Sequence, residues 1–432
     1  MNGETAPSWP LWQRLLFRWW FAYIVLFAFP FPLYYLPFTL PLEWIDNGQT
    51  ALATAVGHAL FGVAEVPVSL QTGSGDTLLA WLVTFTNLLL ATVIAAVWSV
   101  VARRSGGHPK LHSWLRPYVR YLLFAALVSY GFAKIIPTQF PPPTAIRLSE
   151  RVGDLSPMGL LWTFMGYSVP YNVFAGVMEA GSGVLLLFRR TTLLGALLAL
   201  GVLGNVVMLN MAYDVPVKLY SMHLWLMTAW LALPDTGRLT KLLLLNEPVP
   251  AADLAPLISA RWFVWPRVVV KLWACWTLWG VVQGQLPYLS EIRAATTSTT
   301  GVYGAWNVSG FVLSGNEVDG PASTVTAWRT FGANQLNDRG FIRFANDSLI
   351  HIAVEVDSVL ERIAVYPIDS LLHRDSTHAT ILRLAAQGGD SLVLEGSHRG
   401  DSLHMVFTRI DRSSAPLLRR GFRWVQEYPY NR

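Results

Sequence analysis

Long stretches of apolar residues dominate the first two thirds of the chain. A helix needs about 20 residues to cross the roughly 30 Å hydrocarbon core of a bilayer. Seven stretches approach or exceed that length: about 16–38, 77–101, 117–136, 171–188, 191–213, 217–233 and 262–285. An eighth, about 50–66, lacks flanking basic residues, and we interpret it as a re-entrant or interfacial helix. The pattern therefore predicts an α-helical polytopic membrane bundle of about seven spans.

The first stretch has arginines followed by an apolar run, as a signal peptide does. Its run is longer than a signal peptide needs, no small-x-small cleavage site follows it, and Pro30, Pro32 and Pro37 interrupt it. We therefore predict an uncleaved, kinked transmembrane helix.

The pattern changes after Gln285. Residues 341–356 and 390–410 alternate apolar and polar positions, and the turn signals GGD, HRGD and SGNEVDG separate such segments. Short alternating strands predict an antiparallel β-barrel or sandwich. The GAW at 304–306 resembles the G-x-W that opens a lipocalin barrel, and we expect an arginine of RGFRW (420–424) to pack over Trp306. The fold class is thus a helical membrane bundle followed by a lipocalin-like antiparallel β-barrel.

These patterns divide the chain into four parts. Residues 1–110 contain the N-terminal spans and the outer re-entrant segment, and 111–240 form a four-helix core. Residues 241–289 form a cytoplasmic loop and the seventh span, and 290–432 form the extracytoplasmic barrel domain.

Composition and charge agree with a membrane protein. The chain is 53% hydrophobic and 14% charged, whereas soluble domains have about 25% charged residues. Residues 1–289 carry 18 Lys and Arg against 12 Asp and Glu, a net charge of +6, and residues 290–432 carry 14 against 15, a net charge of −1. The positive excess lies in short loops, where it sets orientation, so we expect the bilayer and no nucleic acid as partner. It predicts an inner (plasma) membrane protein with a cytoplasmic N-terminus and a periplasmic C-terminal domain.

Polar and ionisable residues recur within the predicted spans, where they usually face the bundle interior. Lys134 ends the third span, Glu179 lies about two turns into the fourth, and Arg120 and Tyr130 share a helix with Lys134. Further polar residues are Asn205, Asn210, Tyr213, Asp214, Lys218, His223 and, in the eighth stretch, His58. We predict one polar cluster in the outer half of the bilayer, in which Lys134 and Glu179 form a salt bridge or share a water. The alternative is structural, with a snorkelling lysine and asparagines that join helices.

No metal or haem site is expected. The chain has one cysteine, Cys275, which excludes a dithiol relay or a cysteine zinc site within it. A bis-histidine haem would need a partner for His223 at equal depth, and His58 is the only candidate.

The sequences YVRYLLFAALVSYGFAKI (118–135) and YNVFAGVMEAGSGVLLLFRRTTLLGALLAL (171–200) resemble the core of the DoxX/DoxD family. The shared pattern is an arginine that opens one helix, a G-x-x-K that closes it, and an E-x-x-x-G in the next. Here these are Arg120, Gly131, Lys134, Glu179 and Gly183. The resemblance covers about residues 115–235 and implies a four-helix membrane unit. Residues 205–224 and 420–432 resemble a DoxX-like subgroup with a long C-terminal extension.

Relatives in this family imply a quinone-linked membrane oxidoreductase component. Lys134, Glu179 and His223 would be its catalytic residues, and the other polar residues named above would bind substrate. Quinone would be the cofactor, and a partner oxidoreductase subunit would take the electrons because the chain supplies no electron carrier. Two other classes of function stay open: a non-enzymatic membrane scaffold whose β domain binds a partner or lipid, and a small-solute carrier.

Overall fold

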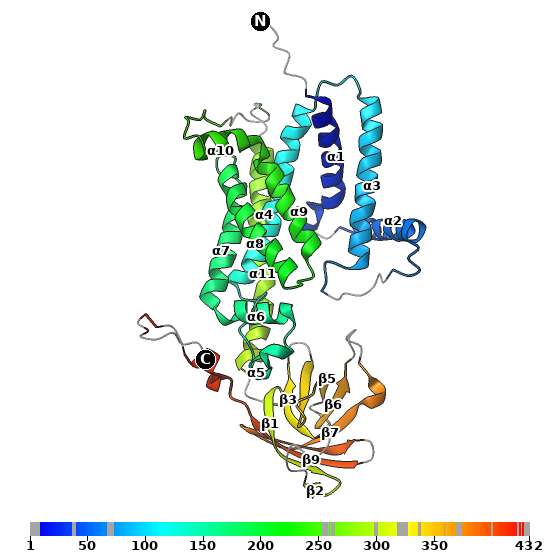
Figure 1. Ribbon diagram of the computed structural model, residues 1–432, viewed down its shortest axis with the longest axis vertical. Coiled ribbons are helices and arrows are strands. Elements are labelled where there is room, and N and C mark those ends of the chain that lie inside the picture. Colours follow the sequence, from blue (N-terminus) through cyan, green and yellow to red (C-terminus); the bar gives the residue numbers. More distant parts are fainter. Residues whose placement is uncertain are drawn as a thin grey trace. The chain divides into compact units, whose positions relative to one another are not determined.

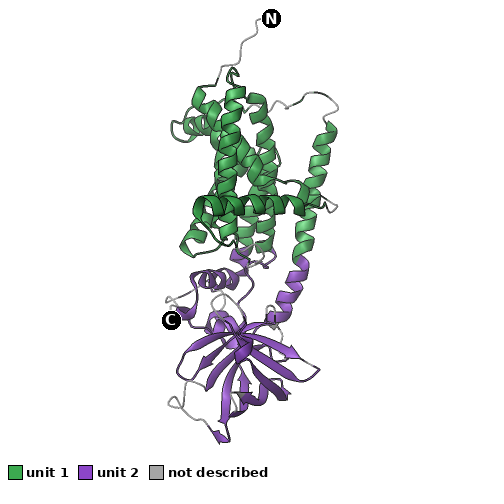
Figure 2. Cartoon of the chain, turned by 90° about the vertical axis from the view of Figure 1, so that its right-hand side faces the viewer, with its two compact units in different colours: residues 1–135, 173–285 green, residues 136–172, 286–432 purple. Residues whose placement is uncertain are grey.

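The chain folds into two compact units (Figure 2). The computed structural model describes residues 9–36, 40–66, 73–252, 258, 260, 264–297, 301–317, 327–335, 338–357, 359–368, 374–398, 401–420, 423–424 and 426. The first unit, here the helical unit, comprises residues 1–135 and 173–285. The second, here the barrel unit, comprises residues 136–172 and 286–432. Residues 136–172 therefore group with the barrel rather than with the expected four-helix core.

Each predicted apolar stretch forms a helix in the helical unit (Figure 1). The helices are α1 (Leu11–Ala28), α2 (Glu43–Phe61), α3 (Leu78–Val101), α4 (Pro109–Ile135), α7 (Val169–Leu186), α8 (Thr192–Ala212), α9 (Lys218–Ala232), α10 (Thr236–Leu243) and α11 (Val264–Thr297), with short 3₁₀ turns at Leu33–Tyr35 and Leu233–Asp235. The first helix ends at Ala28 instead of continuing with a kink, because Pro30 and Pro32 have no backbone N–H to donate. Pro37 lies outside the described residues.

Fewer of these helices have the length and composition of a membrane span than the sequence predicts. Within the described part of the chain, three helices, α3, α4 and α8, are long and apolar enough to cross a membrane. The expected seven spans are therefore not supported by length and composition alone. The other helices are shorter or more polar: α9 has 15 residues, α1 and α7 have 18 each, and α11 carries Arg267 and Lys271 near its start.

Buried apolar side chains from several helices form the core of the helical unit. The most deeply buried include Ile24, Ala91, Val119, Leu123, Leu127, Leu186, Ala196, Leu203, Met227 and Leu231. The α2 helix is different, since it runs across the direction of α3 (Figure 1) and exposes Trp44, Leu60 and Phe61. This crosswise course fits the interfacial interpretation of that segment better than the re-entrant one.

The barrel unit contains a closed antiparallel barrel. Its strands are β1 (Gly304–Leu313), β2 (Asn316–Glu317), β3 (Trp328–Ala333), β4 (Arg339–Phe344), β5 (Leu349–Asp357), β6 (Arg362–Pro367), β7 (Thr380–Gly388), β8 (Ser391–His398) and β9 (Asp401–Arg409). Among the described residues, β1 and β3 to β9 pair in chain order, β9 pairs back with β1, and β2 only extends β1 as a short hairpin. This up-and-down closure confirms the predicted barrel and excludes the sandwich alternative.

Apolar side chains fill the inside of the barrel. Alternate positions of the strands belong to this core, as in β5, where Ile352 and Val354 are core residues and Ala353 between them is buried outside it. Trp306, Phe331, Phe407, Leu382, Leu392 and Met405 are among the fully buried residues of this core. The expected burial of Trp306 is confirmed, since its exposed fraction is 0%.

The arginine that covers Trp306 is Arg409, not an arginine of residues 420–424. Its guanidinium carbon lies 4.1 Å from the Trp306 ring centre, because Trp306 and Arg409 are directly opposite each other on β1 and β9. Gly304 has φ +132°, and a Cβ there would lie 2.8 Å from the Arg409 guanidinium, so this position requires glycine. Arg420, which follows the last strand, instead donates to the side chain of Gln426.

Residues 136–172 pack on the barrel as part of the same unit. They form α5 (Ala145–Ser149), a 3₁₀ turn at Val152–Asp154, and α6 (Pro157–Tyr167). Arg343 of β4, whose side chain is 6% exposed, pairs with Asp154 at 2.7 Å. Arg151 pairs with Asp347 at 2.8 Å, and its hydrogen bond lowers the pKa of that carboxyl below the ordinary value of 3.8. Ion pairs thus attach the segment between α4 and α7 to the barrel.

Candidate functional site

The candidate site lies where α4 and α7 approach each other most closely. A Cβ on Gly131 of α4 would lie 2.6 Å from the backbone nitrogen of Ala180, and a Cβ on Gly176 of α7 would lie 2.5 Å from the carbonyl oxygen of Gly131. Both distances are too short for any side chain, so the two helices touch backbone to backbone. Small residues allow this close packing between helices in a membrane.

Lys134 and Glu179 form a buried ion pair one turn beyond this crossing. The Lys134 Nζ lies 2.5 Å from Glu179 Oε2, and the two side chains are 8% and 4% exposed. The same Nζ lies 3.4 Å from the carbonyl oxygen of Tyr130 and 5.8 Å from the centre of its ring. The predicted approach of Lys134 and Glu179 is confirmed, and the lysine turns into the bundle instead of snorkelling outward.

Arg120 joins the same two helices further along. Its Nε donates to the carbonyl oxygen of Leu186, the last residue of α7, at 2.7 Å. A cation at the C-terminal end of a helix satisfies a free carbonyl and complements the helix dipole. Gly183 lies between these two contacts, where a Cβ would be 3.0 Å from the Cβ of Leu127. All five residues that carry the DoxX-like pattern therefore lie at the α4–α7 contact.

His223 belongs to a different contact. Its Nε2 makes a short hydrogen bond with the Tyr23 hydroxyl of α1, and its Nδ1 lies 2.7 Å from the Leu219 carbonyl oxygen. A carbonyl only accepts, so Nδ1 donates, and in the neutral ring Nε2 accepts from Tyr23. The ring of Phe27 stacks on His223 at 4.1 Å. These contacts fix the histidine between α1 and α9.

Asp214 and Lys218 take part in the turn between α8 and α9. Lys218 Nζ lies 2.8 Å from Asp214 and 3.8 Å from Asp76. Asp76 also accepts the backbone N–H groups of Lys218 and Leu219 at 2.8 and 2.9 Å, which caps the start of α9. Asp76 was absent from our predicted site, although an acidic residue directly before the apolar stretch 77–101 was a usable signal.

The remaining predicted residues have other surroundings. Asn210 donates to the Ser221 hydroxyl at 3.0 Å and so joins α8 to α9. Asn205 and His58 are exposed, and Tyr213 is half-buried at the end of α8. The structure therefore brings Lys134, Glu179 and Tyr130 together and gives the others separate neighbours, instead of assembling the single cluster that we expected.

Sequence reasoning also missed a buried cation. Arg18 of α1, which we used only as an orientation signal, donates to His108 Nε2 at 2.9 Å and to the Ala102 carbonyl oxygen at 3.0 Å. Its position one turn after Arg14, on the same helix face, was the available signal. Within the described ranges, no group of three or more His, Cys, Asp or Glu side chains is arranged to hold a metal ion.

Comparison with known proteins adds little about activity. No protein-family model matches the chain, and no solved structure matches it. An uncharacterized protein, YwoB of Bacillus subtilis (strain 168), is 37% identical over 90 residues, which is 21% of this chain and 56% of the relative. The chain thus spans just over half of the length of that relative.

Proposed function

We propose that this chain is a non-enzymatic membrane scaffold. Its helical unit crosses the inner (plasma) membrane, and its barrel unit binds a partner or a lipid on the extracytoplasmic side. The observation that carries this proposal is the use of Arg120, Lys134 and Glu179 to join α4 and α7. Each has a protein partner across the helix contact and is buried, whereas a catalytic group needs access to a substrate.

The barrel unit is assembled from two separate segments of the chain, and this supports more membrane spans than the three most apolar helices. Residues 136–172 and 286–432 belong to one compact unit, so they lie on the same side of a membrane. The chain between them must then cross an even number of times. If only α8 crossed, the number of crossings between the two segments would be odd. At least one of α7, α9 and α11 must therefore cross as well. Crossing by all four, together with α1, α3 and α4, gives seven spans with a cytoplasmic N-terminus.

Cysteine labelling tests this topology. In a Cys275→Ser background, a membrane-impermeant maleimide should label Gly153→Cys and Val359→Cys in intact spheroplasts, because Val359 is 90% exposed and Gly153 has open space around it. Arg190→Cys, in the exposed turn between α7 and α8, should label only after permeabilisation. Labelling of positions 153 and 359 from opposite sides would contradict the proposal.

A quinone-linked oxidoreductase component is the second candidate. The specific observation in its favour is the buried Lys134–Glu179 pair beside the Tyr130 ring, where a proton can be exchanged with a quinol. A partner subunit would have to accept the electrons. The DoxX-like pattern of α4 and α7 agrees with either candidate.

Quinone binding distinguishes the two candidates. The full chain in lipid nanodiscs is titrated with a water-soluble short-chain quinone, and quenching of tryptophan fluorescence is compared with empty nanodiscs. The scaffold proposal expects no saturable quenching, in wild type or in the Lys134→Met/Glu179→Gln variant. Saturable quenching that this variant abolishes would reject the scaffold and favour the oxidoreductase.

A further inference from the structure

The barrel unit contains a pocket at the end of the barrel where β1 begins and β9 ends. Its walls come from the first turn of α5, the end of α11, the starts and ends of the strands, and the 3₁₀ turn at Arg412–Ser414. Its volume is about 490 Å³, within the range of about 300–1,000 Å³ for small-molecule sites. The pocket is separate from the α4–α7 site, and its lining residues all belong to the barrel unit.

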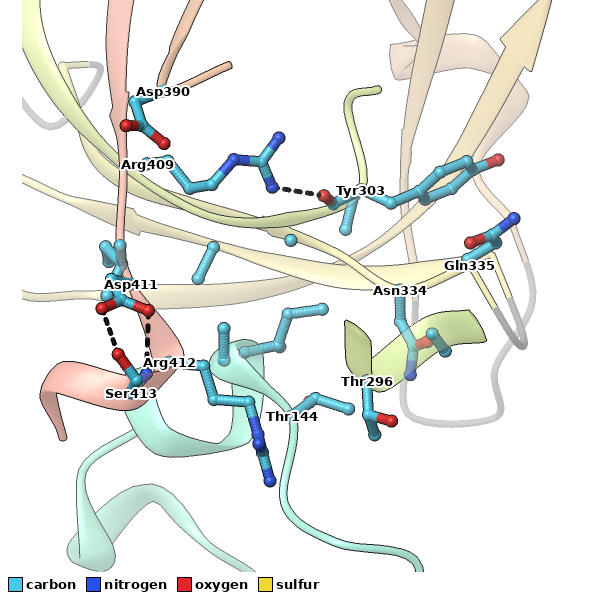
Figure 3. A pocket seen from close by; sticks show the side chains of 17 residues that line it. Thr144, Thr296, Tyr303, Asn334, Gln335, Asp390, Arg409, Asp411, Arg412 and Ser413 are labelled. Carbon is cyan, nitrogen blue, oxygen red and sulfur yellow. Dashed lines mark hydrogen bonds between the residues drawn. The ribbon is translucent and has the colours of Figure 1, made fainter. Parts of the chain in front are cut away.

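Several polar side chains of the pocket have hydrogen-bonding atoms that face its interior. The guanidinium of Arg412 donates from Nε to the Pro143 carbonyl oxygen at 2.7 Å, which leaves both Nη groups unused. The Asp390 carboxylate interacts electrostatically with the neighbouring Arg409 guanidinium, and Gln335 also lines the pocket. In Figure 3, Asp390 lies toward one side of the pocket, and Tyr303 and Gln335 lie toward the other.

Arg409, by contrast, is fully used by the fold. It donates to the carbonyl oxygens of Gly301, Tyr303 and Gly389, and its guanidinium covers the Trp306 ring. Of the two arginines in the pocket, Arg409 is therefore structural, and Arg412 can offer its Nη groups to a ligand.

The charges of the lining balance. Arg409 and Arg412 face Asp390 and Asp411, and the other polar groups are neutral hydroxyls and amides, including those of Thr144 and Gln335. A phosphate or a nucleotide needs an excess of positive charge, and a lipid tail needs an apolar wall. A ligand with many hydroxyl groups instead matches this mixture, since each hydroxyl both donates and accepts. Tyr303, whose side chain packs against the barrel core, also lines the pocket.

We propose that this pocket binds a neutral, polyhydroxylated ligand, a saccharide unit, through Asp390, Gln335 and Arg412. The assignment rests on the proposed function, because it names the ligand class of the barrel unit. Asp390 accepts hydrogen bonds from two sugar hydroxyls, and Arg412 and Gln335 donate to others. The saccharide is either free or part of a longer envelope glycan, since both offer the same hydroxyl groups.

Saturation-transfer NMR on the full chain in nanodiscs tests the proposal. The probes are glucose, galactose, mannose, N-acetylglucosamine and their β-linked trimers at millimolar concentration. We expect saturation transfer to at least one of these sugars. Asp390→Asn removes the charge of a hydrogen-bond acceptor and Gln335→Ala removes a neutral amide donor, so each variant should bind the sugar about tenfold more weakly. Because Asp390 also interacts with the structural Arg409, circular dichroism of each variant checks its fold, and Gln335→Ala tests the pocket without changing a charge.

The controls are Glu317→Gln and Gln387→Ala, which change exposed side chains outside the pocket and should leave binding unchanged. Saturation transfer to a monomer or to a trimer supports the proposal. Transfer to a monomer indicates a free saccharide, and transfer to a trimer alone indicates a unit of a longer glycan. Absence of transfer from every sugar overturns it, as does transfer that Asp390→Asn and Gln335→Ala leave unaltered. Binding of inorganic phosphate in place of sugars would overturn the ligand class. The labelling and quinone experiments do not depend on any of these results.

Discussion

The Lys134–Glu179 pair makes a strong prediction because each partner depends on the other. Both side chains are almost fully buried, and their charged atoms are 2.5 Å apart. Lys134→Met should leave the Glu179 carboxylate buried without its cation, which costs about 3–5 kcal/mol in comparable pairs. Lys134→Met/Glu179→Gln removes both charges and should cost clearly less, because no lone charge remains.

Thermal unfolding of the detergent-solubilised chain measures these differences. A loss of 3–5 kcal/mol corresponds to a fall of roughly 10 °C in the midpoint for a unit of this size. The matched control is Lys241→Met, since Lys241 pairs with Glu247 at 4.0 Å and the two side chains are 54% and 53% exposed. Exposed pairs contribute about 0–1 kcal/mol, so this variant should unfold close to wild type.

Two results would refute the reasoning about the buried pair. The first is a midpoint for Lys134→Met no lower than that for Lys241→Met. The second is a double variant as unstable as the two single changes added together, since independent effects add and coupled ones do not. Either result would mean that the two charges do not stabilise each other.

Three further predictions concern packing and pH. Gly176→Ala should destabilise the helical unit by about 1–3 kcal/mol through overpacking against α4, whereas Gly181→Ala, with open space around it on the same helix, should not; thermal unfolding compares them. Trp306→Ala should destabilise the barrel by about 3–5 kcal/mol, read from loss of the β signal in circular dichroism on heating. Because the folded pKa of Asp347 is lowered by Arg151, its stabilisation is complete above the unfolded pKa and is lost as pH falls through the folded one. The protection of amides at residues 144–155 against hydrogen exchange, corrected for the intrinsic rate at each pH, should therefore fall below about pH 4 in wild type, and Arg151→Gln should remove that additional fall.

Local sequence patterns were sufficient to predict most helices and strands and the contact between Lys134 and Glu179. Alternation predicted the strands around GGD and HRGD, because each hairpin turn lies between segments whose apolar positions all face one core. The Lys134–Glu179 pair was predictable because two charges at similar depth in neighbouring helices have few other partners. Both inferences depend on residues that are close along the chain or on adjacent helices.

Contacts between distant parts of the chain were not predictable in this way. His223 is held by Tyr23, 200 residues earlier, and no periodic pattern links the two. We assigned the arginine that covers Trp306 to residues 420–424 and did not consider Arg409, because the register of the last strand against the first cannot be read from one sequence. The attachment of residues 136–172 to the barrel depends on the Arg343–Asp154 pair, whose partners are 189 residues apart.

The division of the barrel unit between residues 136–172 and 286–432 has a consequence for synthesis of the protein. The ribosome completes the first segment long before β9, the strand that closes the barrel. During that interval Asp154 has no Arg343 to pair with, and the segment lacks the strands on which it packs. Biogenesis therefore includes a waiting period in which this segment is exposed to proteases and chaperones. A chain terminated after α11 would never leave that stage.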